Sequence, residues 1–516
     1  MRQPDSSNDS PVALARLTQP RRPRGKLFLV PAGARRRAGD PGRTGRLKWM
    51  EAGRETDKLD DARDPYDVAF RFLYLFTLLL YIRPDDLFPA LGSHPVAKIA
   101  ATVAFISYAC ARYRLGKPII NWTIEVQMVC MMLCLAILFT PVAASPGDSV
   151  TALSESFLKV VTVFILMIGV INTRARLRKI LSLTVILGTW LAVFAIKDYA
   201  TGNLTMMGDR IEGRVGGIFG NPNDLAAALN MLIPLAVTLA MMSAGAARLF
   251  YIACALALTG GVIVTFSRGG FLTLIALAGV MMWKFGRGRR EKVILAATIA
   301  FVVLATAVPV RYHVRLVSIF DHSQDTVGSA QNRSALLKQG VDLAIRNPIV
   351  GIGMGNFHIY SIGEKVAHNG YVETAAELGM FGLIAYLVLI LAPLRGLARI
   401  EKETLRAGTA ADLEMRNLSI GLQAVLVAYM VASFFLSIQY LWYLYYAAGY
   451  AVALKLIQAA EKSVQAPDQR PGRKFALAKS RPAALSQHQA MGELWKSAPR
   501  KPAGSLWPAY RFRKGF

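Results

Sequence analysis

The chain has 516 residues, of which 54% are hydrophobic, and it combines a mean hydropathy of +0.37 with a formal net charge of +27. These values exclude a chain in which apolar and charged residues are evenly mixed, so the two kinds must occupy separate segments. We therefore expect a membrane domain whose charges lie in its tails and loops.

Both ends of the chain are basic and lack the apolar residues that a core requires. Residues 1–64 are rich in Arg, Pro and Gly, and residues 461–516 repeat Lys, Arg and Pro. We predict two disordered cytoplasmic tails that flank a transmembrane domain of residues 65–460. A basic tail can bind nucleic acid, but the anionic inner leaflet beside it favours contact with membrane lipids, and we expect no nucleic-acid partner. Nothing before Met50 reads as a signal peptide, so Met50 is an alternative start.

The central part of the chain carries segments long enough to span a membrane, which takes roughly 20 mostly apolar residues. The sequence predicts an all-α polytopic membrane protein with about 12 transmembrane helices. The predicted spans are residues 66–83, 95–111, 122–142, 154–172, 179–197, 222–243, 249–266, 269–284, 293–310, 369–394, 418–437 and 440–457.

The charges of the connections predict the orientation of these spans, because short cytoplasmic loops accumulate Lys and Arg. Every second connection is basic, as at 112–117, 174–179 and 287–292, whereas the alternating ones are neutral, acidic or long. This pattern predicts two cytoplasmic termini and one large periplasmic loop, 311–368.

The four cysteines all fall within predicted spans. Cys110, Cys130, Cys134 and Cys254 therefore form neither a disulfide framework nor a metal-binding motif.

Three predicted spans, 222–243, 269–284 and 369–394, enter the membrane from the outer side. Their helix N-termini carry unpaired N–H groups and a partial positive charge, so three of them on one surface favour an anion. Asn221 is a predicted N-cap, with Pro222 at the first helical position.

A distinctive polar residue lies at each of these helix starts: Arg214 upstream of Asn221, Arg268 before a Gly-Gly pair, and His368 before Asn369. Taken singly, an arginine at a boundary extends to lipid headgroups, and a loop histidine is an ordinary surface residue. Their coincidence on one face favours a functional site.

Two further features of this region have structural interpretations. The sequence GIGMGNF (351–357) looks like a phosphate loop, but it lacks the Lys-Ser/Thr partner and is expected to form a tight turn. Glu373 and Glu377 suit the dipole of the helix that they begin, which favours a structural role over a catalytic one.

Four motifs in order resemble the bacterial O-antigen ligase and O-antigen polymerase superfamily, which are membrane glycosyltransferases of the GT-C type. The motifs are RVGGIFGNPNDLA from residue 214, TFSRGGFL from 265, NRSALLKQGVDLAIRNPIVGIGMGNF from 332 and AHNGYVETAAELGMFGLIAYL from 367. The resemblance covers residues 66–457, is strongest over 210–392, and is closest to O-antigen ligases.

The resemblance implies a glycan donor on undecaprenyl pyrophosphate at the periplasmic face of the bacterial inner membrane, in lipopolysaccharide biosynthesis. It implies that Arg214 and Arg268 hold the pyrophosphate and that His368 activates the acceptor hydroxyl, with Arg210 competing for the role of Arg214. The acceptor would be lipid A core, another glycan or a protein.

Guanidinium groups and helix N-termini stabilise the negative charge that develops on a leaving pyrophosphate, and a neutral imidazole accepts the proton of the attacking hydroxyl. No metal or other cofactor is then required, and the chain has no Asp-x-Asp motif. The expected reaction is an inverting displacement. Arg333 and Asn369 are further candidate substrate contacts.

Alternatives remain open at this point. A polymerase would move the growing glycan onto a new repeat unit, although the single long outer loop before the His-Asn motif favours a ligase. A polysaccharide transporter or flippase is a third interpretation. Coupled carriers usually place Asp or Glu within spans, whereas here the acidic residues lie near span ends.

Overall fold

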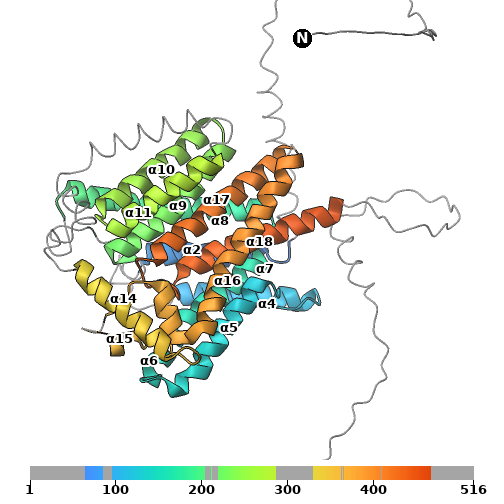
Figure 1. The fold of residues 1–516 in the computed structure, drawn as a ribbon. Coiled ribbons are helices and arrows are strands. Elements are labelled where there is room, and N and C mark those ends of the chain that lie inside the picture. Colours follow the sequence, from blue (N-terminus) through green and yellow to red (C-terminus); the bar gives the residue numbers. More distant parts are fainter. Residues whose placement is uncertain are drawn as a thin grey trace, which may run out of the picture. The chain divides into compact units, whose positions relative to one another are not determined.

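The computed structural model describes residues 64–84, 96–203, 211, 219–285, 329–361, 363, 365–407 and 409–465. The chain separates into two units, Met1–Ala459 and Ala460–Phe516, and the features below belong to the first. All regular secondary structure in the described residues is helical (Figure 1), which confirms the all-α class. The two predicted tails and the predicted span 293–310 lie outside the described residues.

Each of the remaining predicted spans is covered by a helix. The long helices are α2 (Asp67–Ile82), α4 (Val96–Arg114), α5 (Ile124–Phe139), α7 (Leu158–Val170), α8 (Arg174–Ala200), α9 (Pro222–Met242), α10 (Gly245–Val264), α11 (Arg268–Phe285), α14 (Ser329–Arg346), α16 (Gly370–Ala407), α17 (Ala410–Ser433) and α18 (Trp442–Gln465). Short helical turns are η2 (Thr140–Val142), α6 (Pro146–Thr151), η3 (Ala152–Phe157) and α15 (Phe357–Tyr360). By length and composition, 8 helical segments of the described residues can cross a membrane.

Helix α9 lies at the centre of the first unit, packed against α8, α10, α11 and α17. Of the 18 residues that make up its apolar stretch, 83% are buried, whereas the same share is 17% in α11 and 22% in α10. The predicted cap is confirmed, because the Asn221 side chain accepts the N–H of Asn223 (2.8 Å) and Pro222 occupies the first turn. The start of α9 is therefore fixed within the core.

Helix α16 is two helices joined at a break, at Gly379. The φ and ψ of Gly379 are 66° and −172°, a region that is essentially restricted to glycine. A Cβ there would lie 2.5 Å from the carbonyl oxygen of Ile349. The break lets the chain before α15 approach the backbone of α16.

The C-terminal ends of α11 and α16 are joined to the middle of α17 by a buried polar group. Lys284 Nζ lies 2.7 Å from Glu401 and 3.0 Å from Gln423, whose amide donates to Glu401 (3.1 Å). Removing one member of such a buried pair typically costs about 3–5 kcal/mol. This contact holds α11 at the end opposite to Arg268.

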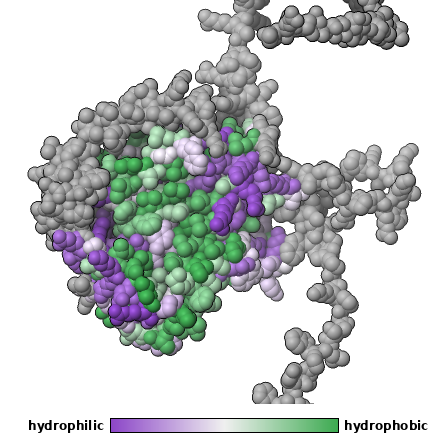
Figure 2. Space-filling model, viewed as in Figure 1, coloured by the Kyte–Doolittle hydropathy of each residue, from purple (hydrophilic) through white to green (hydrophobic). Residues whose placement is uncertain are grey.

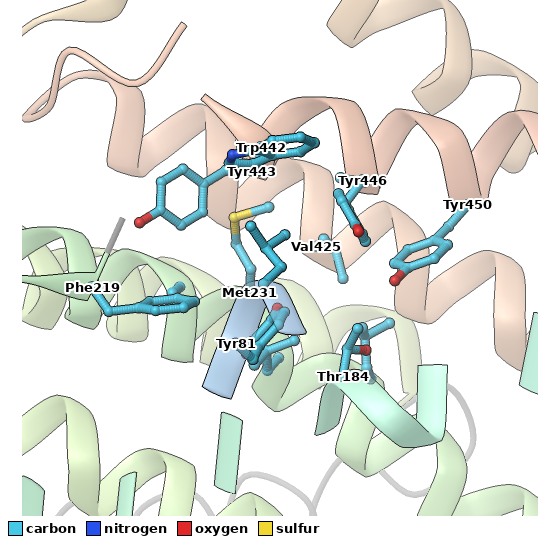
Figure 3. A pocket seen from close by; sticks show the side chains of 14 residues that line it. Tyr81, Thr184, Phe219, Met231, Val425, Trp442, Tyr443, Tyr446 and Tyr450 are labelled. Carbon is cyan, nitrogen blue, oxygen red and sulfur yellow. The ribbon is translucent and has the colours of Figure 1, made fainter. Parts of the chain in front are cut away.

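An apolar pocket of about 500 Å³ lies between α2, α8, α9, α17 and α18 (Figure 3). Its walls are mostly aromatic, including Tyr81, Phe219, Trp442, Tyr446 and Tyr450. None of the predicted site residues within the described part of the chain lines it. Such a lining suits hydrocarbon rather than pyrophosphate.

Candidate functional site

The starts of α9, α11 and α16 meet at one end of the first unit, as the sequence predicted. The hydroxyl of Ser267, just before α11, donates to the side chain of Asn223 in the first turn of α9 (2.8 Å). Asn369, just before α16, donates to the carbonyl of Phe434 (3.4 Å), and Phe435 packs on Gly269 of α11. The connection between α17 and α18 therefore links the starts of α11 and α16.

The start of α11 is built for a close approach to α9. Ser267 is buried, and its Oγ accepts the N–H of Gly270 (3.1 Å), so this serine caps the helix. A Cβ on Gly270 would lie 2.6 Å from the Cβ of Ala226, and the Gly270 carbonyl accepts a bond from Asn230 (3.0 Å). The Ser-Arg-Gly-Gly sequence thus fixes Arg268, the half-buried first residue of α11, beside α9.

A pocket of about 250 Å³ opens at these helix starts. It is lined by Asn223, Ser267, Gly269 and Gly270, by Phe435 and Leu436 of the α17–α18 connection, and by Arg333 of α14. Arg333 therefore joins the helix starts, although it comes from the predicted outer loop. Arg268 lies in sequence between two lining residues. Helix N-termini and a guanidinium at one pocket favour an anionic ligand.

His368 lies in a left-handed turn directly before α16, with a φ of 52°. The side chain is half-buried. Burial, and to a smaller extent the positive charges of Arg333 and Lys365, lower the pKa of His368 to about 4. The imidazole is therefore neutral at neutral pH and can accept a proton. An anion bound beside Arg333 would offset these charges and raise the pKa of His368.

Glu373 holds the turn that contains His368. Its carboxylate accepts the backbone N–H of Ala367 (2.9 Å) and bonds from the hydroxyl of Ser437 and the amide of Gln439 (2.9 Å for the amide). The side chain is 6% exposed. Glu373 therefore joins the peptide before His368 to the α17–α18 connection. It positions the histidine through the backbone, since none of these three bonds involves the His368 side chain.

The glycine-rich segment 351–357 forms left-handed turns at Gly351, Gly353 and Gly355, as the tight-turn interpretation predicted. Its N–H groups at Ile352 and Gly353 donate to the carbonyls of Ala376 and Glu377 (2.9 and 3.0 Å). These carbonyls are freed by the break at Gly379. The segment fills the break in α16 and is not a phosphate loop.

Asn369 has a structural position in addition to its predicted role. Its Oδ1 accepts the N–H groups of Tyr371 and Val372 (both 3.1 Å), so it caps α16. Its role as a substrate contact stays a prediction. Arg210 and Arg214 lie outside the described residues.

Residues 252–387 match the family model described as O-antigen ligase. This segment of the chain is similar to O-antigen ligases. The match confirms the resemblance found in the sequence and supports an O-antigen ligase-like or polymerase-like membrane function. No curated protein matches the chain.

The matched segment contains Arg268, Arg333, His368 and Asn369, whereas Arg210 and Arg214 precede it. Sequence reasoning did not find Ser267 or the positioning contacts of Glu373. The sequence could have predicted the Ser267 cap, because serine is a preferred N-cap residue and Ser267 directly precedes the helix. The Glu373 contacts were not, because Ser437 and Gln439 lie in a remote connection.

Proposed function

We propose that the chain is an O-antigen ligase-like glycosyltransferase that moves a glycan from undecaprenyl pyrophosphate to an acceptor hydroxyl, such as one of lipid A core. The single observation that supports it best is the pocket that Arg333 shares with the starts of α9 and α11, where Arg268 lies in sequence between the lining residues Ser267 and Gly269. His368 lies close enough to Arg333 for the two charges to interact.

In the proposed reaction the acceptor oxygen attacks the anomeric carbon, and the bond from that carbon to the pyrophosphate oxygen breaks. His368 takes the proton of the acceptor hydroxyl, and undecaprenyl pyrophosphate leaves with the bonding electron pair. Arg268, Arg333 and, by resemblance, Arg214 or Arg210 stabilise the charge on the leaving group. Back-side attack inverts the anomeric configuration, and the step as written uses no metal.

We further propose that the pocket faces the periplasm and that both termini are cytoplasmic. The exposed Arg395 and Arg399 lie in α16 far from His368, and Arg174 begins α8 at a basic connection. Short cytoplasmic loops carry an excess of Lys and Arg, which supports this orientation.

The test uses purified protein in lipid with a labelled undecaprenyl-pyrophosphate glycan, with and without lipid A core. We expect the label to move as one block onto the core. Longer glycans that remain on undecaprenyl would instead establish a polymerase. No movement of the label onto lipid A core or onto glycan would contradict glycan transfer to these acceptors.

A further inference from the structure

Helix α14 (Ser329–Arg346) presents three kinds of surface rather than the two of an ordinary surface helix. One face, with Leu336, Gly340 and Leu343, is buried, and α14 packs on α16. Gly340 permits this contact, since a Cβ there would lie 2.7 Å from Val372. The remaining surface is exposed and is divided into an apolar and a charged stripe.

The apolar stripe consists of Leu337, Val341 and Ile345, which are four residues apart and share one side of the helix. It continues past the end of α14 into Ile349 and Val350. Ile345 is 72% exposed and Ile349 is 65% exposed. Large aliphatic side chains with this exposure are unfavourable in water.

The charged stripe lies beside it and contains Lys338, Asp342 and Arg346, each one residue after a member of the apolar stripe. Asp342 and Arg346 form an exposed ion pair (2.9 Å). A helix with a packed face, an apolar stripe and a charged stripe is suited to a membrane–water boundary, where one exposed side meets lipid and the other meets water.

The apolar stripe is continuous with the exposed surface of a membrane span. The carbonyl of Pro348 accepts the N–H of Met380 (2.8 Å), which joins the chain after α14 to α16 just past its break at Gly379. Met380, Phe381 and Ile384 of that span are exposed apolar residues. Figure 2 shows the apolar surface of the helices running up to the polar side chains of this region.

The depth of this junction agrees with a position at the edge of the hydrocarbon. The exposed Arg395 marks the far end of the span in α16. A span of roughly 20 residues counted back from it begins near residue 375, so Met380 and Pro348 lie about one turn inside the apolar layer.

We propose that the C-terminal half of α14 lies in the boundary layer of the bilayer, with Val341, Ile345, Ile349 and Val350 against lipid chains and Lys338, Asp342 and Arg346 toward water. The occupant of the apolar stripe is lipid, because the stripe continues the surface of a span. Helix α14, which is part of the predicted outer loop, then holds Arg333 near the lipid surface.

The experiment compares two single cysteines introduced into the full chain in lipid nanodiscs, Ile345→Cys on the apolar stripe and Asp342→Cys on the charged stripe. Each is labelled with a nitroxide, and the collision rates with oxygen and with a water-soluble nickel chelate are measured. The wild-type chain, labelled in parallel, gives the background from Cys110, Cys130, Cys134 and Cys254. We expect the nitroxide at 345 to collide with oxygen several-fold more than with the chelate, and the ratio at 342 to be reversed.

Equal access of the chelate to both positions would overturn the proposal, because it would place the stripe in water. Exclusion of both probes from position 345 would also overturn it, because the occupant would then be protein. As a second measurement, Ile345 and Ile349 are replaced together by Asn, and Lys338 and Asp342 together by Asn. Each pair is introduced into Val341→Cys carrying a fluorophore, and quenching by doxyl-labelled lipid is measured. We expect only the first pair to lose this quenching several-fold, and no loss would contradict lipid contact. None of these readouts depends on glycan transfer.

Discussion

Two polar segments approach α16 and use their polar groups in opposite ways. Asn356 of the glycine-rich segment is fully buried, accepts the N–H of Ser145 (2.7 Å), and donates to the hydroxyl of Ser149 (2.7 Å) and the carbonyl of Met354 (3.1 Å). His368, in contrast, is half-buried in a left-handed turn, and it interacts electrostatically with Arg333, which lines a pocket. In a membrane domain, polar groups paired within the chain hold the fold, whereas ionisable groups at a pocket mark function.

The largest expected effect is on glycan transfer, and it distinguishes His368 from His358, the histidine that follows the glycine-rich segment. His368→Asn should lower transfer by the 10²- to 10⁴-fold, roughly, that a general base contributes. Asparagine tolerates the left-handed backbone, so insertion and yield should be unchanged. The measurement is label transfer per amount of folded protein.

The matched control is His358→Asn in the glycine-rich region. His358 contacts the Gly355 carbonyl and lies 3.6 Å from Asp148, away from the pocket residues. It should transfer at the wild-type rate. Equal losses in the two variants would show that the region, and not one base, sustains activity.

Arg268→Lys should have the next largest effect on glycan transfer. An ammonium cannot reproduce the planar two-pronged contact of a guanidinium with a phosphate. Loss of one charge-assisted hydrogen bond, about 1.5–3 kcal/mol, corresponds to a decrease in kcat/KM of about 10- to 100-fold. Arg399→Lys, at an exposed position of α16, is the control and should behave as wild type. A normal kcat/KM in Arg268→Lys would mean that Arg268 contacts lipid headgroups instead.

Gly379→Ala tests the structural segment. A side chain at this backbone conformation should lower the free energy of unfolding by about 1–3 kcal/mol, and the Cβ would contact the Ile349 carbonyl at 2.5 Å. Thermal unfolding in detergent measures it. Gly279→Ala in α11 meets no atom within 4 Å and should be neutral or stabilising by up to about 1 kcal/mol. A stable Gly379→Ala protein would show that α16 is not broken there.

The smallest expected effect is a shift in pH dependence in Arg333→Gln, which accompanies the loss of kcat/KM expected for a residue that stabilises the leaving group. The positive charge of Arg333 lowers the pKa of His368, so its removal should raise that pKa, while burial, the larger cause, stays. The acidic limb of kcat/KM, which reports the free enzyme and lies near pH 4 in the wild type, should move to higher pH by a fraction of a unit. A shift to lower pH would contradict the proximity of the two groups.

The sequence predicted the helical class, the cap at Asn221 and the meeting of three helix starts, because apolar length and loop charge are local signals. It did not predict the break at Gly379, since a glycine in a span resembles any small residue until the segment that fills the break is known. Glu373 was expected to serve the helix dipole, and its contacts with Ala367, Ser437 and Gln439 required the tertiary fold.

Arg333 shows the same limit from the functional side. The sequence offered Arg333 as a candidate substrate contact, but a cation in a long polar loop does not indicate which residues lie beside it. The structure places it in one pocket with Ser267 and Asn223. Helix packing brings these residues together, and a linear pattern cannot encode that distance.

The most direct test of the central claim compares binding of undecaprenyl pyrophosphate with binding of undecaprenyl phosphate, in the wild type and in Arg268→Lys. We expect the wild type to bind the pyrophosphate more tightly and the variant to lose most of that preference. Equal affinities in the wild type, or a preference that survives in Arg268→Lys, would contradict a pyrophosphate site at the start of α11.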